Sequence, residues 1–236
     1  MSPEAAQAFI LDDIPLWVDP ESFLRQLRLP PHHETRQEIA ELARQAQSLA
    51  RPKALYRHSP VEEVGEDFVR LEGVSLRSRL LSHNLRTAKC VFPYLATCGT
   101  ELEAWSQGGH SLLTRYAMEA LKSLALEAAL RAFREHLDSM FHPGQLSVMN
   151  PGSLADWPLQ EQLSLFRLLG DHAGALGVRL TESLLMVPVK SVSGLAFGSR
   201  SGYLNCRLCR RERCPSRKAA YDAEFRKRVD ALPEKQ

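Results

Sequence analysis

AKCVFPYLAT, at residues 88–97, is an apolar run rich in Val, Phe and Tyr, which is the composition of a buried β-strand. The run ends at Cys98-Gly99, after which Thr100 and Glu103 have the spacing of a capping box for a short helix. The longest predicted helix follows at residues 111–137. Its apolar side chains form one broad stripe: Leu113, Tyr116, Ala117, Ala120, Leu121, Leu124, Ala128, Ala132 and Phe133. This helix is therefore expected in the core, together with the strand.

The remaining elements mix helices and short strands without a regular alternation. Further helices are predicted at residues 19–28, 34–50, 75–85 and 159–169, and strands at residues 53–58, 67–71 and within 178–197. Residues 148–157 contain Pro and Gly and are expected to form a loop. Because regular β–α repeats are missing, the predicted fold class is α+β rather than a doubly wound parallel sheet.

Composition sets limits on function. The 236 residues are 44% hydrophobic and 25% charged, with a formal net charge of +2, so bulk charge gives no reason to expect nucleic acid or a membrane as partner. No stretch has the length of a membrane span, and the first residues lack the pattern of a signal peptide, so a cytoplasmic location is expected. The signatures of P-loop, Rossmann and H-E-x-x-H proteins are missing from the sequence.

Three of the five cysteines lie within nine residues, in the sequence Cys206-Arg-Leu-Cys209-Arg-Arg-Glu-Arg-Cys214-Pro. Thiolates at such spacing are typical ligands of zinc or of an iron–sulfur cluster, and either site needs a fourth ligand. Cys98 is preferred over Cys90 for that role, because it follows a strand and precedes a helix N-terminus that would stabilise a thiolate. Disulfides or ordinary free thiols are the alternative.

The cysteines are interleaved with basic residues. From residue 206 to 218, six cations face one anion: Arg207, Arg210, Arg211, Arg213, Arg217 and Lys218 against Glu212. Such a run is often no more than a solvated basic segment. Around a cluster with thiolate ligands, however, these cations would offset negative charge and raise the reduction potential.

One block of the sequence resembles a known family. Residues 180–194 meet the pattern L-T-E-S-x-x-M-x-P-x-x-S-V-S-G of the activation domain of cobalamin-dependent methionine synthase. The matching residues are Leu180, Thr181, Glu182, Ser183, Met186, Pro188, Ser191, Val192, Ser193 and Gly194. Pro151-Gly152, followed by residues 156–162, resembles the Pro-Gly loop and helix of the same family. The resemblance implies a twisted antiparallel sheet bordered by helices.

The resemblance also implies a function and a ligand loop. Domains of this family bind S-adenosylmethionine and restore cobalamin that has slipped to the Co(II) state. The matching loop here is Asn150, Pro151, Gly152 and Ser153. Val148 stands where the family has an arginine for the ligand carboxylate, and Ser153 stands where it has an aromatic residue, so the chain departs from the family at this loop.

These observations predict three regions: an N-terminal helical or extended segment (1–52), an activation-like domain (53–200), and a cysteine-rich segment with a C-terminal helix (201–236). The leading hypothesis is a partner of a corrinoid-binding protein or split methionine synthase. In it, Cys98, Cys206, Cys209 and Cys214 hold an iron–sulfur cluster, a four-iron one if all four bind, which passes an electron to Co(II). The alternatives are a zinc-stapled docking module and an S-adenosylmethionine-dependent reactivase. Cobalamin itself would come only with the partner.

Overall fold

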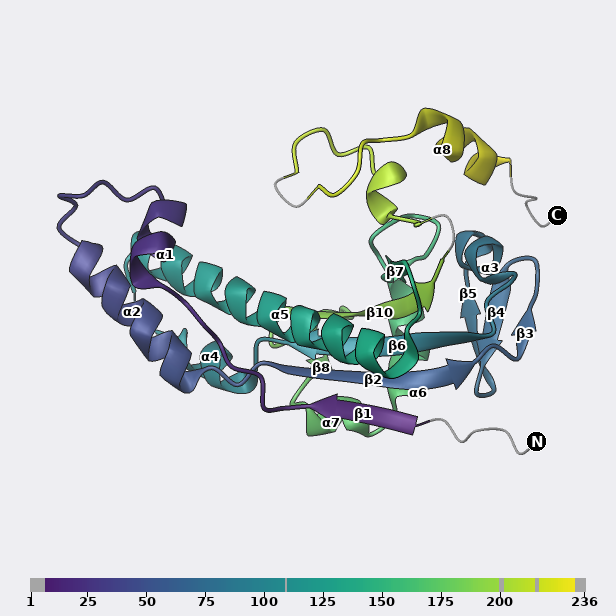
Figure 1. The fold of residues 1–236 in the computed structure, drawn as a ribbon, viewed down its shortest axis with the longest axis horizontal. Helices are drawn as coiled ribbons and strands as arrows, with labels where there is room; N and C mark the ends of the chain where they lie inside the picture. The colour runs from purple at the N-terminus through teal and green to yellow at the C-terminus, as the bar shows by residue number, and fades with distance from the viewer. Residues whose placement is uncertain (1–6, 109, 200–201, 215–216, 232–236) are drawn as a thin grey trace.

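A five-stranded antiparallel sheet forms the centre of the computed structural model, which describes residues 7–108, 110–199, 202–214 and 217–231 (Figure 1). The strand order is β1 (Gln7–Leu11), β2 (Lys53–Pro60), β6 (Cys90–Thr97), β10 (Ser191–Gly198) and β7 (Leu146–Met149). The predicted strand at residues 88–97 is thus β6, in the middle of the order. Its position explains its composition, because strands cover both of its edges and other elements cover both of its faces.

The two faces of the sheet pack against different helices. On one face, side chains such as Tyr56 and Tyr94 pack against α5 (Leu112–Phe141), where the Tyr94 and Phe133 rings stack with centroids 4.8 Å apart. On the other face, Leu55, Leu95 and Leu195 pack against α3 (Arg79–Leu85) and α6 (Gln162–Leu169). The alternation of side chains along each strand therefore divides the apolar residues between two cores.

A further group of helices packs around the N-terminal half of α5, at the left of Figure 1. It comprises α1 (Pro20–Gln26), α2 (Arg36–Leu49) and α4 (Thr100–Trp105). Smaller elements complete the fold: β3 (Glu63–Val64), β4 (Phe68–Leu71), β5 (Val74–Arg77), η1 (Leu159–Glu161), α7 (His172–Ala175), β8 (Arg179–Leu180), β9 (Met186–Val187), η2 (Asn205–Arg207) and α8 (Ala223–Asp230). Within the described ranges, no helix has the length and apolar character needed to cross a membrane.

The structure confirms the α+β class and changes several local predictions. The predicted helix at 75–85 begins as strand β5, because Ser78 caps the helix only from Arg79. The predicted loop at 148–157 begins inside strand β7, which the Pro-Gly pattern obscured. Gly99, not Thr100, is the N-cap of α4. At the N-terminus, β1 pairs with β2 and so extends the central sheet.

Candidate functional site

The C-terminal segment, residues 202–231, is attached to the edge of the sheet. Leu204 forms a parallel bridge with Val148 of β7, and Tyr203, Leu208 and Val229 are buried in the core beneath the second face of the sheet. Figure 1 shows this segment, in yellow, beside β7. An ion pair between Arg226 of α8 and Asp156, with an N–O distance of 2.9 Å, ties the helix to the loop after β7. The cysteine motif is therefore held against the family's ligand loop.

Within this segment lies the cysteine loop, defined here as residues 206–214 with 217 and 218. The Arg217 guanidinium donates to the carbonyl oxygens of Cys206 at 3.3 Å and Cys209 at 3.4 Å, and it also donates to that of Arg211. The N–H of Lys218 donates to Cys206 Sγ at 3.4 Å. The thiols of Cys206, Cys209 and Cys214 are free and partly exposed.

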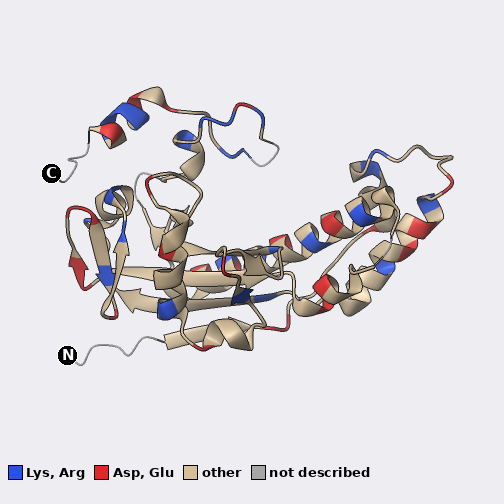
Figure 2. Ribbon diagram, turned by 180° about the vertical axis from the view of Figure 1, so that it is seen from behind, with Lys and Arg blue, Asp and Glu red and all other residues tan. Residues whose placement is uncertain are grey.

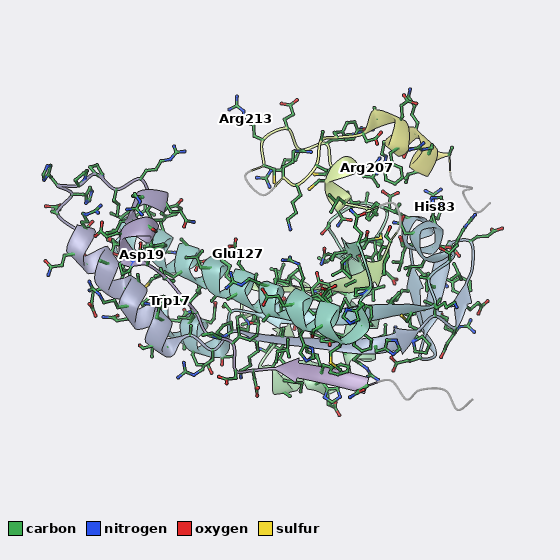
Figure 3. All side chains as sticks on the ribbon, in the orientation of Figure 1. Trp17, Asp19, His83, Glu127, Arg207 and Arg213 are labelled. Carbon is green, nitrogen blue, oxygen red and sulfur yellow. The ribbon has the colours of Figure 1, made fainter. Side chains whose placement is uncertain are left out.

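The surface of the cysteine loop is strongly basic. Figure 2 shows Lys and Arg along most of it, and in Figure 3 Arg213 points away from the rest of the molecule. Arg207 is engaged internally, since it pairs with Asp222 at 2.5 Å and lies 4.9 Å from the centre of the Phe225 ring. Arg210, Arg211 and Arg213 are exposed to solvent. A negatively charged cluster bound here would thus meet both fixed and solvent-facing cations.

Cys98 lies in a different environment. It is fully buried at the end of β6, in the apolar cluster formed by α1, α2, α4 and α5. Burial, with the Glu103 carboxylate nearby, raises the pKa of Cys98 to about 12, so the group is a neutral thiol at physiological pH. Among the described residues, no three His, Cys, Asp or Glu side chains are grouped as a metal site would require. Cys206, Cys209 and Cys214 thus share one loop, but the structure does not group their thiols at a common point, and Cys98 lies apart from them in the helical cluster.

Cys90, the other candidate for the fourth ligand, is half-buried at the start of β6, next to the aromatic residues of the α5 face. Burial raises the pKa of the Cys90 thiol. Neither of the two cysteines outside the loop thus has the setting of a thiolate ligand.

A cavity of about 300 Å³, called here the α5–β7 pocket, joins the ligand loop to the cysteine loop. Its polar lining residues come from β6, α5, the turn after β7, η2 and the cysteine loop: Tyr94, Arg134, Asn150, Asn205, Cys206 and Lys218. Its apolar lining consists of Leu130, Phe133, Leu146, Val148, Val192 and Leu204. The structure thus places Val148 and Asn150, which the sequence comparison with the family singled out, in the same cavity as Cys206.

Asn150 is fixed across the floor of this pocket. Its side-chain amide donates to Tyr94 Oη at 2.7 Å and to the carbonyl oxygen of Ser193 at 2.8 Å. This position requires Gly194 in β10, because a Cβ there would lie 2.5 Å from Asn150 Nδ2 and 2.4 Å from the carbonyl oxygen of Met149. Burial raises the pKa of Tyr94 to about 12, so its hydroxyl keeps a proton that it can donate.

The other residues of the predicted ligand loop shape the turn rather than line the pocket. Gly152 has a φ of 78°, and its N–H donates to the carbonyl oxygen of Trp157 at 2.8 Å. Ser153 is exposed, and its N–H donates to the carbonyl oxygen of Asn150 at 3.2 Å. Pro151 is buried. Of these four residues, Asn150 is therefore the one whose side chain faces the cavity.

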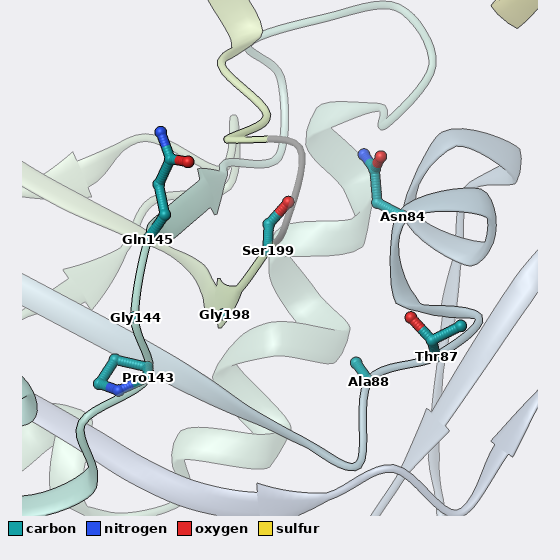
Figure 4. Close-up of a pocket in the computed structure, with 8 residues that line it drawn as sticks. All are labelled: Asn84, Thr87, Ala88, Pro143, Gly144, Gln145, Gly198 and Ser199. Carbon is teal, nitrogen blue, oxygen red and sulfur yellow. The ribbon is translucent and has the colours of Figure 1, made fainter.

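A second, open cavity of about 560 Å³ has no charged side chain in its lining. Figure 4 shows it between the end of α3, the turn after α5 and the end of β10, with Asn84, Gln145 and Ser199 among its polar residues. It holds none of the predicted site residues, so we place the candidate site in the α5–β7 pocket and the cysteine loop.

Comparison with known proteins finds one family in sequence and a similar fold among solved structures. Residues 151–219 match the family described as "Vitamin B12 dependent methionine synthase, activation domain". Among solved structures, the chain is similar to one described as the MetH reactivation domain bound to AdoHcy, with a TM-score of 0.62, 16% identity, and coverage of 85% of this chain and 81% of that one. Comparison with the curated proteins gives no match.

The chain therefore shares the fold of this reactivation domain. In sequence, residues 151–219 are similar to the activation-domain family of vitamin B12 dependent methionine synthases. The matched block includes β8, β9 and β10, and it extends into the cysteine loop.

Three residues of the pocket had no signal in the sequence. Arg134 is an exposed arginine on α5, Lys218 belongs to a basic run, and Asn205 precedes the first loop cysteine. Nothing in their spacing relates one to another. Only the packing of the C-terminal segment beside β7 brings them to one cavity.

Proposed function

We propose that this chain activates a corrinoid-binding protein by passing an electron to Co(II) through an iron–sulfur cluster bound by Cys206, Cys209 and Cys214. The observation that carries the proposal is the structure of the cysteine loop. Arg217 donates hydrogen bonds to the carbonyl oxygens of Cys206 and Cys209, and the N–H of Lys218 donates to Cys206 Sγ. The similarity of residues 151–219 to the activation-domain family supports a corrinoid-binding protein as the partner. The loop supplies a place for the redox centre that such a role needs.

Cys206, Cys209 and Cys214 would hold the cluster. A cluster or a zinc ion would need a fourth ligand besides these three thiols, because Cys98 is buried elsewhere. A small molecule or a group from the partner protein could supply it.

A cluster held by Cys206, Cys209 and Cys214 would supply one electron for the reduction of Co(II) to Co(I), and a low-potential one-electron donor protein would replace that electron. No bond within this chain would form or break. The cations around the loop would favour the reduced, more negative form of the cluster.

A second candidate function is binding of a ligand of the S-adenosylmethionine class in the α5–β7 pocket. The supporting observation is that Asn150, in the loop that resembles the family's ligand loop, lines a cavity deep enough for a small molecule. The structure that the chain resembles is described as bound to AdoHcy. Such a ligand would act together with the cluster, since Cys206 lines the same cavity.

The test is metal and sulfide analysis with a visible absorption spectrum on protein purified without oxygen. We expect iron and sulfide in nearly equal amounts, loss of both in a Cys206→Ser/Cys209→Ser variant, and their retention in Cys90→Ser. We also expect the reduced protein to convert a Co(II) corrinoid protein to Co(I). If the protein contains zinc but no iron, the electron-transfer role is wrong and a zinc-stapled docking module takes its place. If it contains neither zinc nor iron, both hypotheses are wrong.

A further inference from the structure

The two edges of the central sheet differ in what covers them. At one edge, Val148 of β7 forms a bridge to Leu204 of the C-terminal segment. At the other edge, β1 pairs with β2 alone among the described strands, and Figure 1 shows it, in purple, along the lower border of the sheet. The free side of β1 therefore presents backbone N–H and C=O groups that no described strand pairs with.

The sequence of β1 lacks the features that usually protect an edge strand. Such strands are normally blunted by a charged side chain, a proline or a bulge. The segment Gln7–Leu11 contains neither a charged residue nor a proline, and its register with β2 runs without interruption. The side chain of Ile10 is 42% exposed. This edge is therefore suited to pairing with a further strand.

A groove beside this edge indicates the kind of strand that would fit. It is a cavity of about 560 Å³ between β1, the residues that follow it and the C-terminal half of α5. Its apolar lining consists of Ile10, Leu11, Ile14 and Ala132, and its polar lining of Asp12, Asp13, Glu135, His136 and Ser139. The three carboxylates are exposed, and none belongs to an ion pair found among the described residues. The groove is thus complementary to a segment that carries both apolar and basic side chains.

We propose that β1 binds an extended, basic segment of a partner protein, which adds a strand to the sheet and places its cations against Asp12, Asp13 and Glu135. Backbone hydrogen bonds to β1 supply the affinity, and the charge of the groove selects the segment. The cysteine loop lies beside β7, at the opposite edge of the sheet. A partner held at β1 therefore leaves that loop accessible, whether or not the loop holds a metal.

The test is fluorescence anisotropy with two labelled peptides long enough to span β1, one of alternating valine and lysine and one of alternating valine and glutamate. The first should bind at least about 10-fold more tightly at low salt, because its charge is complementary and that of the second is repelled. Ile10→Lys should abolish this binding, because a lysine on an edge strand opposes pairing. Leu112→Lys, which changes an exposed leucine at the start of α5, is the matched control and should bind normally.

Hydrogen exchange locates the bound peptide. The valine–lysine peptide should slow the exchange of residues 7–11, because it pairs with their backbone, whereas attraction to acidic side chains alone would leave that exchange unchanged.

The charge of the groove is tested by a second pair of variants. Asp12→Asn/Asp13→Asn should weaken binding of the valine–lysine peptide by about 3- to 10-fold. Glu34→Gln/Glu66→Gln removes the same charge from exposed positions outside the groove and should leave binding unchanged. Urea unfolding of each variant without peptide shows that a loss of binding is not a loss of the fold.

The proposal is overturned if neither peptide binds, if the two bind equally well, or if residues 7–11 gain no protection. Sedimentation of the protein alone tests the other occupant of this edge. A dimer that Ile10→Lys converts to monomer would assign the edge to a second copy of this chain and would likewise overturn the proposal, whereas a monomer leaves β1 free for the partner.

Discussion

The core around β6 and the C-terminal segment hold their cysteines in opposite ways. Cys98 is surrounded by apolar side chains from four helices, and its Sγ has only a weak contact with the carbonyl oxygen of Gly99, at 3.5 Å. Cys206 lies on a loop held by hydrogen bonds from Arg217 and Lys218, with Leu208 as its nearest buried anchor in sequence. Apolar burial stabilises the neutral thiol of Cys98, whereas Cys206 is partly exposed and lies beside N–H groups and cations.

The difference shows that the position of a cysteine relative to a strand and a helix is a poor guide to ligation. Packing around the thiol decides its charge, and packing is set by residues distant in sequence. Here α2 and α5 close over Cys98. The C-terminal segment, by contrast, has few buried residues per unit length, so its local stability is expected to be lower than that of the sheet.

The largest expected effect tests whether the two regions unfold together. Leu95→Ala removes a fully buried side chain from β6 and should lower the free energy of unfolding by about 2–5 kcal/mol, measured by urea denaturation. Leu208→Ala removes a side chain that is also buried, but from the C-terminal segment. We expect it to leave the main transition almost unchanged and to speed proteolysis within residues 202–231. Equal losses in the main transition would show that the segment and the sheet form one cooperative unit.

Much of the sheet could be predicted because its signals are local. The apolar run of β6 and the stripe of α5 are each contained in one stretch of sequence, and both are found where expected. The edge strand β7 was missed, because its four residues precede a Pro-Gly turn and its partners lie in β10 and at Leu204. The same long-range contacts create the α5–β7 pocket, so Arg134 and Asn205 could not be assigned to it from sequence.

An intermediate effect separates structural from ligating thiols. Cys98→Ser places a more polar hydroxyl in an apolar cluster and should cost about 1–3 kcal/mol of stability, with the metal content unchanged. Cys206→Ser should do the reverse: it should abolish metal binding and change the stability of the metal-free protein by less than about 0.5 kcal/mol. Metal analysis and urea denaturation of both variants show which of the two cysteines binds metal and which stabilises the fold. A loss of metal in Cys98→Ser, at unchanged stability, would restore Cys98 as the fourth ligand.

The smallest expected effect is the loss of stability of α8 at acidic pH. The side chain of Asp222 accepts from the Phe225 N–H at 2.8 Å and from Arg207, and these bonds hold the pKa of its carboxyl below the usual value. Arg226 likewise lowers the pKa of Asp230 at the other end of α8. A carboxyl group whose pKa is lower in the folded than in the unfolded state stabilises the folded protein. This stabilisation is complete above the unfolded pKa, which is about 3.9 for Asp, and it is lost as the pH falls through the folded pKa.

Acidification below about pH 4 should therefore loosen α8 before it affects β6. Hydrogen exchange measured by mass spectrometry, expressed as protection factors to remove the intrinsic effect of pH, should show protection of residues 223–230 falling first. Asp222→Asn keeps a side chain that can cap α8 but cannot titrate, so its protection should change less steeply with pH. An unchanged pH profile in that variant would show that Asp222 does not hold the segment. The remaining acid sensitivity would then be assigned to the pair that Arg226 makes with Asp230.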